Sequence, residues 1–82
     1  ITVDYARHGV RAVALCPGMI ETPLTGWRLA DPVLREEVLA RIPQHEIGAI
    51  GHVVAAVKFL SSDEAGYFNG AALPMDGGWV AQ

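Results

Sequence analysis

The sequence has very little cysteine, and this limits both its covalent chemistry and its expected location. Cys16 is the only cysteine among 82 residues, so no disulfide can form within the chain. Because Cys16 belongs to an apolar segment, we expect it to be a small buried core residue and not a reactive thiol. A chain without disulfides suits a reducing compartment, and we therefore expect a cytoplasmic protein.

Basic residues and long apolar runs are also scarce. Six Lys and Arg stand against nine Asp and Glu, for a net charge of -3. Without a cationic stripe, the sequence predicts no nucleic-acid partner and no anionic membrane surface. No apolar stretch approaches the roughly 20 residues that a membrane helix needs. The three histidines have no Cys, Asp or Glu at metal-ligand spacing, so no metal site is predicted.

The apolar content is nevertheless high. Hydrophobic residues make up 51% of the chain, which argues for a folded protein and against disorder. A chain of 82 residues allows one small domain at most, with a thin margin of stability. The chain begins at Ile1, within a helical pattern and without an initiator Met, so we expect it to be a piece of a longer protein.

One stretch, residues 10–24, is expected to carry a binding loop. Its apolar run from Val10 to Leu15 lacks polar alternation, which is typical of a strand covered on both faces in a parallel sheet. Pro17 and Gly18 should end this strand with a sharp turn. In open α/β sheets, ligands bind at the carboxyl ends of the strands. Thr22 then offers a hydroxyl to a ligand, or caps a short helix that begins at Pro23.

The remaining elements follow from periodicity and capping signals. Apolar spacing predicts the end of a helix before Gly9 and a second helix over Ile50–Leu60. Asp31 and Pro32 mark the start of another helix. We expect a second strand over Ala71–Met75, stopped by the turn Asp76-Gly77-Gly78.

The helical segment after the binding loop contains large apolar residues. Trp27, Leu29 and Leu34 either line a substrate pocket or simply pack onto the body of the protein. Glu37 and Arg41 have the spacing of an ion pair on one helix face, which should be solvated.

Taken together, these motifs resemble one family. The matching segments are DYA (4–6), GVR (9–11), CPGMIETP (16–23), FLSSDEA (59–65) and LPMDGGW (73–79). They resemble the C-terminal third of the classical short-chain dehydrogenase/reductases over the whole chain. Val13 departs from the family pattern, in which an Asn is often found.

The resemblance implies a fold and a cofactor. Residues 1–82 would be the C-terminal portion of a single doubly wound, Rossmann-type α/β domain, supplying its last two parallel strands and the helices between them. Residues 23–47 would cover the substrate. NAD or NADP would be the cofactor, its nicotinamide end held by Pro17, Gly18, Ile20 and Thr22.

The resemblance places the catalytic Tyr-x-x-x-Lys motif upstream of this chain. Neither Tyr5 nor Tyr67 is followed by Lys after four residues, and Lys58 is the only lysine, so no catalytic residue is predicted here. The parent would transfer a hydride between NAD(P) and a small alcohol or carbonyl substrate. It would be a homodimer or homotetramer through the helix Ile50–Leu60 and the strand Ala71–Met75. The alternative is a non-catalytic, dimerising relative of the same fold.

Overall fold

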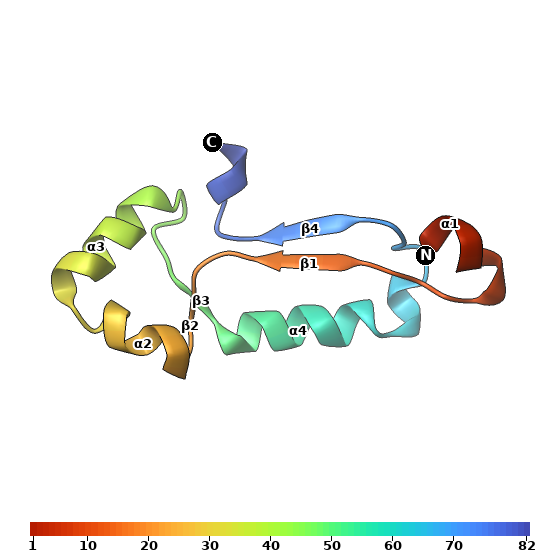
Figure 1. The fold of residues 1–82 in the computed structure, drawn as a ribbon, viewed down its shortest axis with the longest axis horizontal. Helices are drawn as coiled ribbons and strands as arrows, with labels where there is room; N and C mark the ends of the chain where they lie inside the picture. The colour runs from red at the N-terminus through yellow and green to blue at the C-terminus, as the bar shows by residue number, and fades with distance from the viewer.

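The computed structural model describes residues 1–82, which form an α/β arrangement with two small parallel ladders (Figure 1). The elements in chain order are α1 (Thr2–Tyr5), β1 (Ala14–Pro17), β2 (Ile20–Glu21), α2 (Pro23–Leu29), α3 (Pro32–Arg41), β3 (Gly48–Ala49), α4 (Ile50–Leu60) and β4 (Ala72–Met75). Short 3-10 helices occupy Ala6–His8, Asp63–Ala65 and Trp79–Ala81.

The first ladder pairs β1 with β4 in parallel, as the sequence predicted, with Ala14 opposite Ala72 and Pro17 opposite Met75. The strand includes Pro17, which the sequence placed outside it. The backbone N–H groups of Ala14 and Gly18 donate to carbonyls of the segment around β4. In this register the nitrogen of Pro17 faces the opposite, open edge of β1, so its missing N–H costs no ladder hydrogen bond.

The predicted start of this strand at Val10 is wrong. Residues 10–13 lie outside the ladder, because β4 begins only at Ala72 and the chain before it turns at Asn69 and Gly70. The backbone N–H and carbonyl of Ala12 form hydrogen bonds with this turn instead of with a strand. The Ala12 N–H donates to Asn69 Oδ1 at 3.1 Å, and the Gly70 N–H donates to the Ala12 carbonyl at 2.7 Å.

The second ladder joins the two ends of the segment that contains α2 and α3. β2 pairs in parallel with β3, with Ile20 opposite Gly48, and the Gly48 N–H donates to the Met19 carbonyl at 3.0 Å. The chain therefore leaves at Glu21 and returns at Gly48, with α2 and α3 projecting at one end of the molecule (Figure 1). We call residues 23–47 the lid segment.

α4 runs alongside β1 and spans Ile50–Leu60, which confirms the predicted helix (Figure 1). A side chain caps the start of α4, because the Ala49 N–H donates to His52 Nδ1 at 2.9 Å. At the other end, the Arg11 side chain binds backbone carbonyls. The guanidinium donates to the carbonyls of Leu60 and Ala65 at 3.0 and 2.9 Å and, more weakly, to those of Ser62 and Phe68. Arg11 thus joins the segment before β1 to the end of α4.

The capping signals in the sequence are confirmed. Gly9 ends the first helical segment with φ of 78°, a left-handed conformation that glycine adopts without steric cost. Asp31 Oδ1 accepts hydrogen bonds from the N–H groups of Val33 and Leu34, and Pro32 occupies the first position of α3. These local interactions fix where each helix begins or ends.

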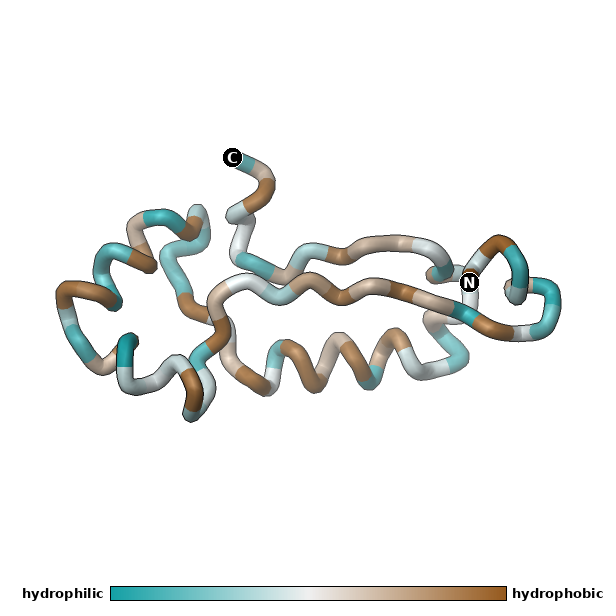
Figure 2. Tube along the Cα trace, viewed as in Figure 1, coloured by the Kyte–Doolittle hydropathy of each residue, from teal (hydrophilic) through white to brown (hydrophobic).

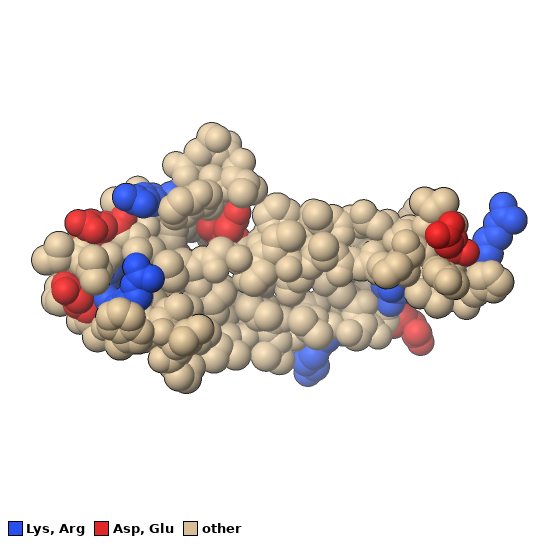
Figure 3. Space-filling view, in the orientation of Figure 1, with Lys and Arg blue, Asp and Glu red and all other residues tan.

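The molecule is elongated and has almost no core of its own. Its radius of gyration is 15.7 Å, whereas a compact domain of this length has about 12 Å. Only Leu29, Ile42 and Ala65 are buried. Hydrophobic residues follow β1, β4 and α4 (Figure 2), and the visible face over the middle of the two strands carries no charged side chain (Figure 3).

The expectation that Cys16 is buried is wrong. Cys16 is exposed, because β1 pairs with one strand only and nothing in residues 1–82 covers that face. The predicted Glu37–Arg41 ion pair is also absent. The ion pairs are Arg35–Glu21 at 2.7 Å and His45–Glu36 at 3.7 Å. An exposed pair on a helix contributes only about 0.3–0.5 kcal/mol, too little to impose one geometry.

Candidate functional site

The predicted binding loop lies at the carboxyl end of β1, between the two ladders. Gly18 is required there by the close approach of the chain after β4. A Cβ atom at Gly18 would lie 2.7 Å from Asp76 Cβ and 3.0 Å from its Cα. Since real Cβ atoms do not come this close to a backbone atom of a packed turn, a larger residue would push the loop away from β4.

Thr22 caps α2, which confirms the capping interpretation of the sequence. The Thr25 N–H donates to Thr22 Oγ1 at 3.3 Å, and the Thr22 N–H donates to Thr25 Oγ1 at 2.9 Å. Thr25 also donates its hydroxyl to the Ile20 carbonyl at 2.8 Å. The hydroxyl proton of Thr22 has only the distant Thr25 Oγ1, at 3.3 Å, as an acceptor within the chain. It can therefore turn to a ligand while the cap stays in place.

A cavity of about 240 Å³ separates the loop from the lid segment. Its lining residues are Met19, Thr25, Arg28, Leu29, Leu34, Glu37, Val38, Arg41 and Trp79. We call it the lid cavity. Leu29 is buried and Leu34 is 38% exposed, and both line the cavity. Trp27 lies outside it and is 72% exposed. The structure therefore brings together two of the three apolar residues that the sequence singled out.

The polar side chains of the lid cavity leave an excess of positive charge. Arg28 and Arg41 contribute guanidinium groups, and Glu37 contributes one carboxylate. Neither guanidinium donates a hydrogen bond or joins an ion pair within the chain, although Arg28 lies 5.9 Å from the centre of the Trp27 ring. A cavity with apolar walls and two unpaired guanidinium groups suits a small molecule with an anionic end.

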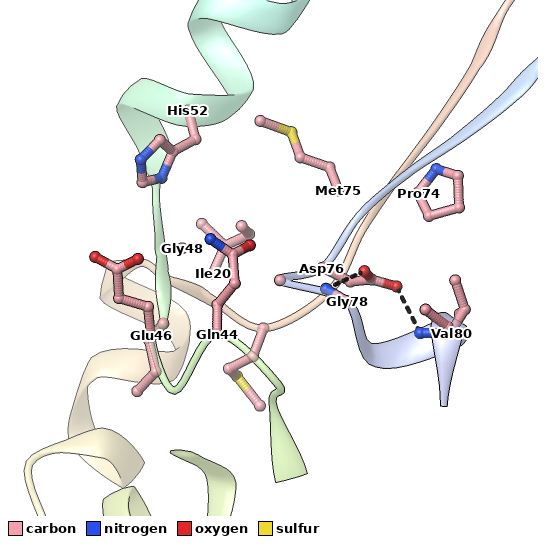
Figure 4. A pocket seen from close by; sticks show the side chains of 14 residues that line it. Ile20, Gln44, Glu46, Gly48, His52, Pro74, Met75, Asp76, Gly78 and Val80 are labelled. Atoms are coloured by element: carbon pink, nitrogen blue, oxygen red, sulfur yellow. Dashed lines mark hydrogen bonds between the residues drawn. The ribbon is translucent and has the colours of Figure 1, made fainter. Parts of the chain in front are cut away.

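A second cavity, of about 560 Å³, lies on the other side of the loop (Figure 4). Ile20 and Met75 form apolar parts of its wall. Gln44 and Glu46 project from the loop before β3, and His52 projects from the first turn of α4. Asp76 is engaged in the C-terminal turn, where its carboxylate accepts from the N–H groups of Gly78 and Val80 at 3.0 and 3.2 Å. This supports the prediction of a tight turn at residues 76–78.

The four predicted cofactor residues share one stretch of backbone but do not line one cavity. Ile20 lines the second cavity, whereas Pro17, Gly18 and Thr22 line neither. Met19 lies between them and lines both cavities. The loop thus separates the two cavities, and a ligand could contact it from either side.

Sequence reasoning missed Thr25, Arg28 and the cavity role of Arg41. The Thr-x-x-Thr spacing of residues 22 and 25 could have identified Thr25, because it has the geometry of a reciprocal helix cap. The sequence predicts a solvated face for Arg41, and Arg41 is exposed, but its side chain also borders the lid cavity. No sequence signal indicates which side of α3 faces α2.

The structure contains no group of three or more His, Cys, Asp or Glu side chains arranged to hold a metal ion. None of its helices combines the length and the apolar character needed to cross a membrane.

Comparison with known proteins gives the chain a family. Residues 1–80 match the family model described as enoyl-(acyl carrier protein) reductase. The 2-(R)-hydroxypropyl-CoM dehydrogenase of Xanthobacter autotrophicus (strain ATCC BAA-1158 / Py2) is 59% identical over 81 residues, which cover 99% of this chain and 32% of that protein. The chain thus spans about a third of the length of this curated relative.

Solved structures of dehydrogenases have the same fold over nearly the whole chain. A candidate 2-deoxy-D-gluconate 3-dehydrogenase from Agrobacterium tumefaciens with bound NADP has a TM-score of 0.90 and 38% identity, over 99% of this chain and 33% of that one. A 4-hydroxyisoleucine dehydrogenase complexed with NADH has a TM-score of 0.93 and 25% identity, over 99% and 33%. From its motifs, its parallel strands and these matches, the chain belongs to the short-chain dehydrogenase/reductase family.

Proposed function

We propose that residues 1–82 belong to an NAD(P)-dependent oxidoreductase that transfers a hydride between the cofactor and a small alcohol or carbonyl compound. The observation that carries this proposal is the lid cavity, which lies directly beside the loop predicted to hold the cofactor and is bordered by its Met19. The similarity to dehydrogenases over nearly the whole chain supports it. The chain would form the C-terminal third of one Rossmann-type domain.

The share of this chain in the reaction is to position the nicotinamide end of the cofactor and to enclose the substrate. Pro17, Gly18, Ile20 and Thr22 would hold the nicotinamide end, with the Thr22 hydroxyl as a donor that the fold leaves largely unused. NAD(P), when bound, accepts or gives the hydride. The proton of the alcohol would go to a side chain outside residues 1–82, because neither tyrosine here has the required lysine partner.

The lid cavity favours an anionic substrate. Arg28 and Arg41 would bind the charged end, and Leu29 and Leu34 would enclose the apolar part. The relative from Xanthobacter autotrophicus is a 2-(R)-hydroxypropyl-CoM dehydrogenase, and the negative charge of that compound is one that two guanidinium groups can bind. We therefore propose a secondary alcohol or ketone that carries an anionic group.

The test is an assay of the full-length protein with 2-(R)-hydroxypropyl-CoM or with the neutral alcohol 2-propanol, and with NAD⁺ or NADP⁺. Formation of the reduced nicotinamide, with kcat/KM at least about tenfold higher for the anionic substrate, is expected. Arg28→Gln and Arg41→Gln should reduce this preference, whereas Arg7→Gln, at an exposed site far from the cavity, should not. Turnover with neither substrate and no binding of either cofactor would contradict the proposed function.

We also propose that the full-length protein is a homodimer or homotetramer. α4 presents Ile50, Val54 and Val57 at about half exposure, and β4 has an open edge. Open strand edges and contiguous apolar surface are normally covered. The remainder of the parent domain would cover the edge of β1, and a second copy would cover α4 and β4.

A further inference from the structure

Arg35 makes a three-way contact that no feature of the sequence predicted. Its Nη1 donates to Glu21 Oε1 at 2.7 Å and to the Leu29 carbonyl at 3.3 Å. The three residues come from different elements, since Glu21 ends β2, Leu29 ends α2 and Arg35 lies in the second turn of α3. One guanidinium thus joins the loop to both helices of the lid segment.

The position of this contact relates it to the lid cavity. α2 contributes Arg28 and Leu29 to the cavity, and α3 contributes Leu34, Glu37, Val38 and Arg41. The separation of these two helices therefore sets the width of the cavity. Arg35 contacts the end of α2 from outside the cavity, because it is adjacent to Leu34 but does not itself line the cavity.

We propose that Arg35 and Glu21 are a positioning pair that holds the α2–α3 hairpin in register with the cofactor loop. The carbonyl of Leu29 belongs to the C-terminal end of α2, where a cation is favoured by the partial negative charge of the helix. Glu21 lies between Ile20 and Thr22, so the pair connects the α2–α3 hairpin to the loop that is proposed to hold the cofactor. This inference rests on the proposed function.

The pair acts on geometry and contributes little to stability. Its side chains are 44% and 48% exposed, so solvent screens the attraction. Small misplacements of a substrate-positioning element nevertheless weaken binding measurably. We expect Glu21→Gln or Arg35→Gln to raise KM for the substrate about threefold to fivefold, with kcat and the cofactor dissociation constant within about twofold of wild type.

The experiment is a double-mutant cycle in the full-length protein, with 2-(R)-hydroxypropyl-CoM as the substrate probe. Glu21→Arg and Arg35→Glu should each raise KM, and the exchanged double variant should have a lower KM than either single variant. Glu36→Gln is the matched control, because Glu36 lies on α3 beside Arg35 and forms its ion pair with His45, which is not part of the cofactor loop, at 3.7 Å. An unchanged KM in the single variants, or an additive increase in the double variant, would overturn the proposal.

A second measurement keeps this inference separate from the proposed function. Amide hydrogen exchange over residues 23–41 should be faster in Glu21→Gln than in Glu36→Gln, whether or not the wild-type protein turns over this probe. Equal protection in the two variants would overturn the positioning role. If exchange over residues 23–41 is faster in Glu21→Gln than in Glu36→Gln but the wild-type protein turns over no substrate, the positioning role stands and the proposed activity is contradicted.

Discussion

The two halves of this molecule are held together in different ways. The lid segment contains two of the three buried residues, Leu29 and Ile42, and its helices have side-chain caps from Thr22 and Asp31. The half formed by β1, β4 and α4 contains only the buried Ala65. It exposes a contiguous run of elements with large apolar side chains, whereas the lid segment exposes single ones such as Trp27. The exposed side chains of the sheet half include Val10, Ile50, Val54, Val57, Phe59 and Phe68, at 39–50%.

This difference shows where each half obtains its stability. Local hydrogen bonds within a few residues of each other specify the lid helices. The sheet half has the apolar composition of a protein interior, but no other protein surface packs against it within residues 1–82. Apolar burial is the dominant favourable term in folding, so this half depends on protein surface that residues 1–82 do not supply.

The largest expected effect comes from removing that surface altogether. Residues 1–82 expressed alone should not form a cooperatively folded monomer. Six apolar side chains that lose about half of roughly 1.5–3 kcal/mol each forgo about 5–9 kcal/mol, against a typical net stability of about 5–15 kcal/mol. Circular dichroism during a urea titration should show a broad, shallow change. A sharp two-state transition from a monomer would refute the dependence on outside surface.

Replacing Arg11 removes the side-chain hydrogen bonds that join the segment before β1 to the end of α4. Arg11→Met in the full-length protein should lower the free energy of unfolding by about 2–3 kcal/mol, because backbone carbonyls at the end of α4 lose a charged donor. Denaturant titration measures this loss. Arg7→Met, at an exposed residue without a side-chain hydrogen bond, is the control. Equal stability of the two variants would mean that the end of α4 is satisfied by water instead.

A charge on α4 tests whether a second copy covers the sheet half. Val57→Asp should convert the proposed oligomer to smaller species, since an unpaired carboxylate in an apolar interface costs several kcal/mol. Light scattering at micromolar concentration gives the mass. Lys58→Asp, at the neighbouring and more polar position, should leave the mass unchanged. A wild-type protein that is already monomeric would remove α4 and β4 as an interface.

The smallest expected effect separates the two roles of Thr22. Thr22→Val in the full-length protein should weaken cofactor binding by about 1 kcal/mol, the scale of one hydrogen bond, while the protein stays folded. Thr22→Ser keeps the hydroxyl and should bind like wild type. Titration calorimetry with NAD⁺ and NADP⁺ measures both variants. The same dissociation constant for Val and Ser would leave Thr22 as a helix cap only.

Much of the fold was predictable from local chemistry. The helix Ile50–Leu60, the left-handed Gly9 and the start of α3 at Asp31-Pro32 follow from periodicity and from capping groups a few residues away. The parallel pairing of the two strands was also predicted, and it is confirmed by the register of β1 with β4. The family followed from motifs that lie within continuous stretches of sequence.

The candidate site was only partly predictable. The sequence placed Pro17, Gly18, Ile20 and Thr22 on one loop, but it did not reveal that Met19 would separate two cavities or that Thr25 would bind the loop backbone. The prediction of a Glu37–Arg41 ion pair was wrong because it, too, depended on the surroundings of a side chain. A weak pairing on one helix face cannot be judged without knowing what lies opposite that face.

By itself, therefore, the sequence determined the helix Ile50–Leu60, the helix start at Asp31-Pro32 and the family, because each depends on residues close together along the chain. Only the tertiary structure decided that Cys16 is exposed, that Arg11 reaches the end of α4 and that Arg35 joins Glu21 to Leu29. The physical reason is distance in sequence. Arg11 lies 49 residues before Leu60, and Arg35 lies 14 after Glu21, so no periodicity or cap encodes these contacts.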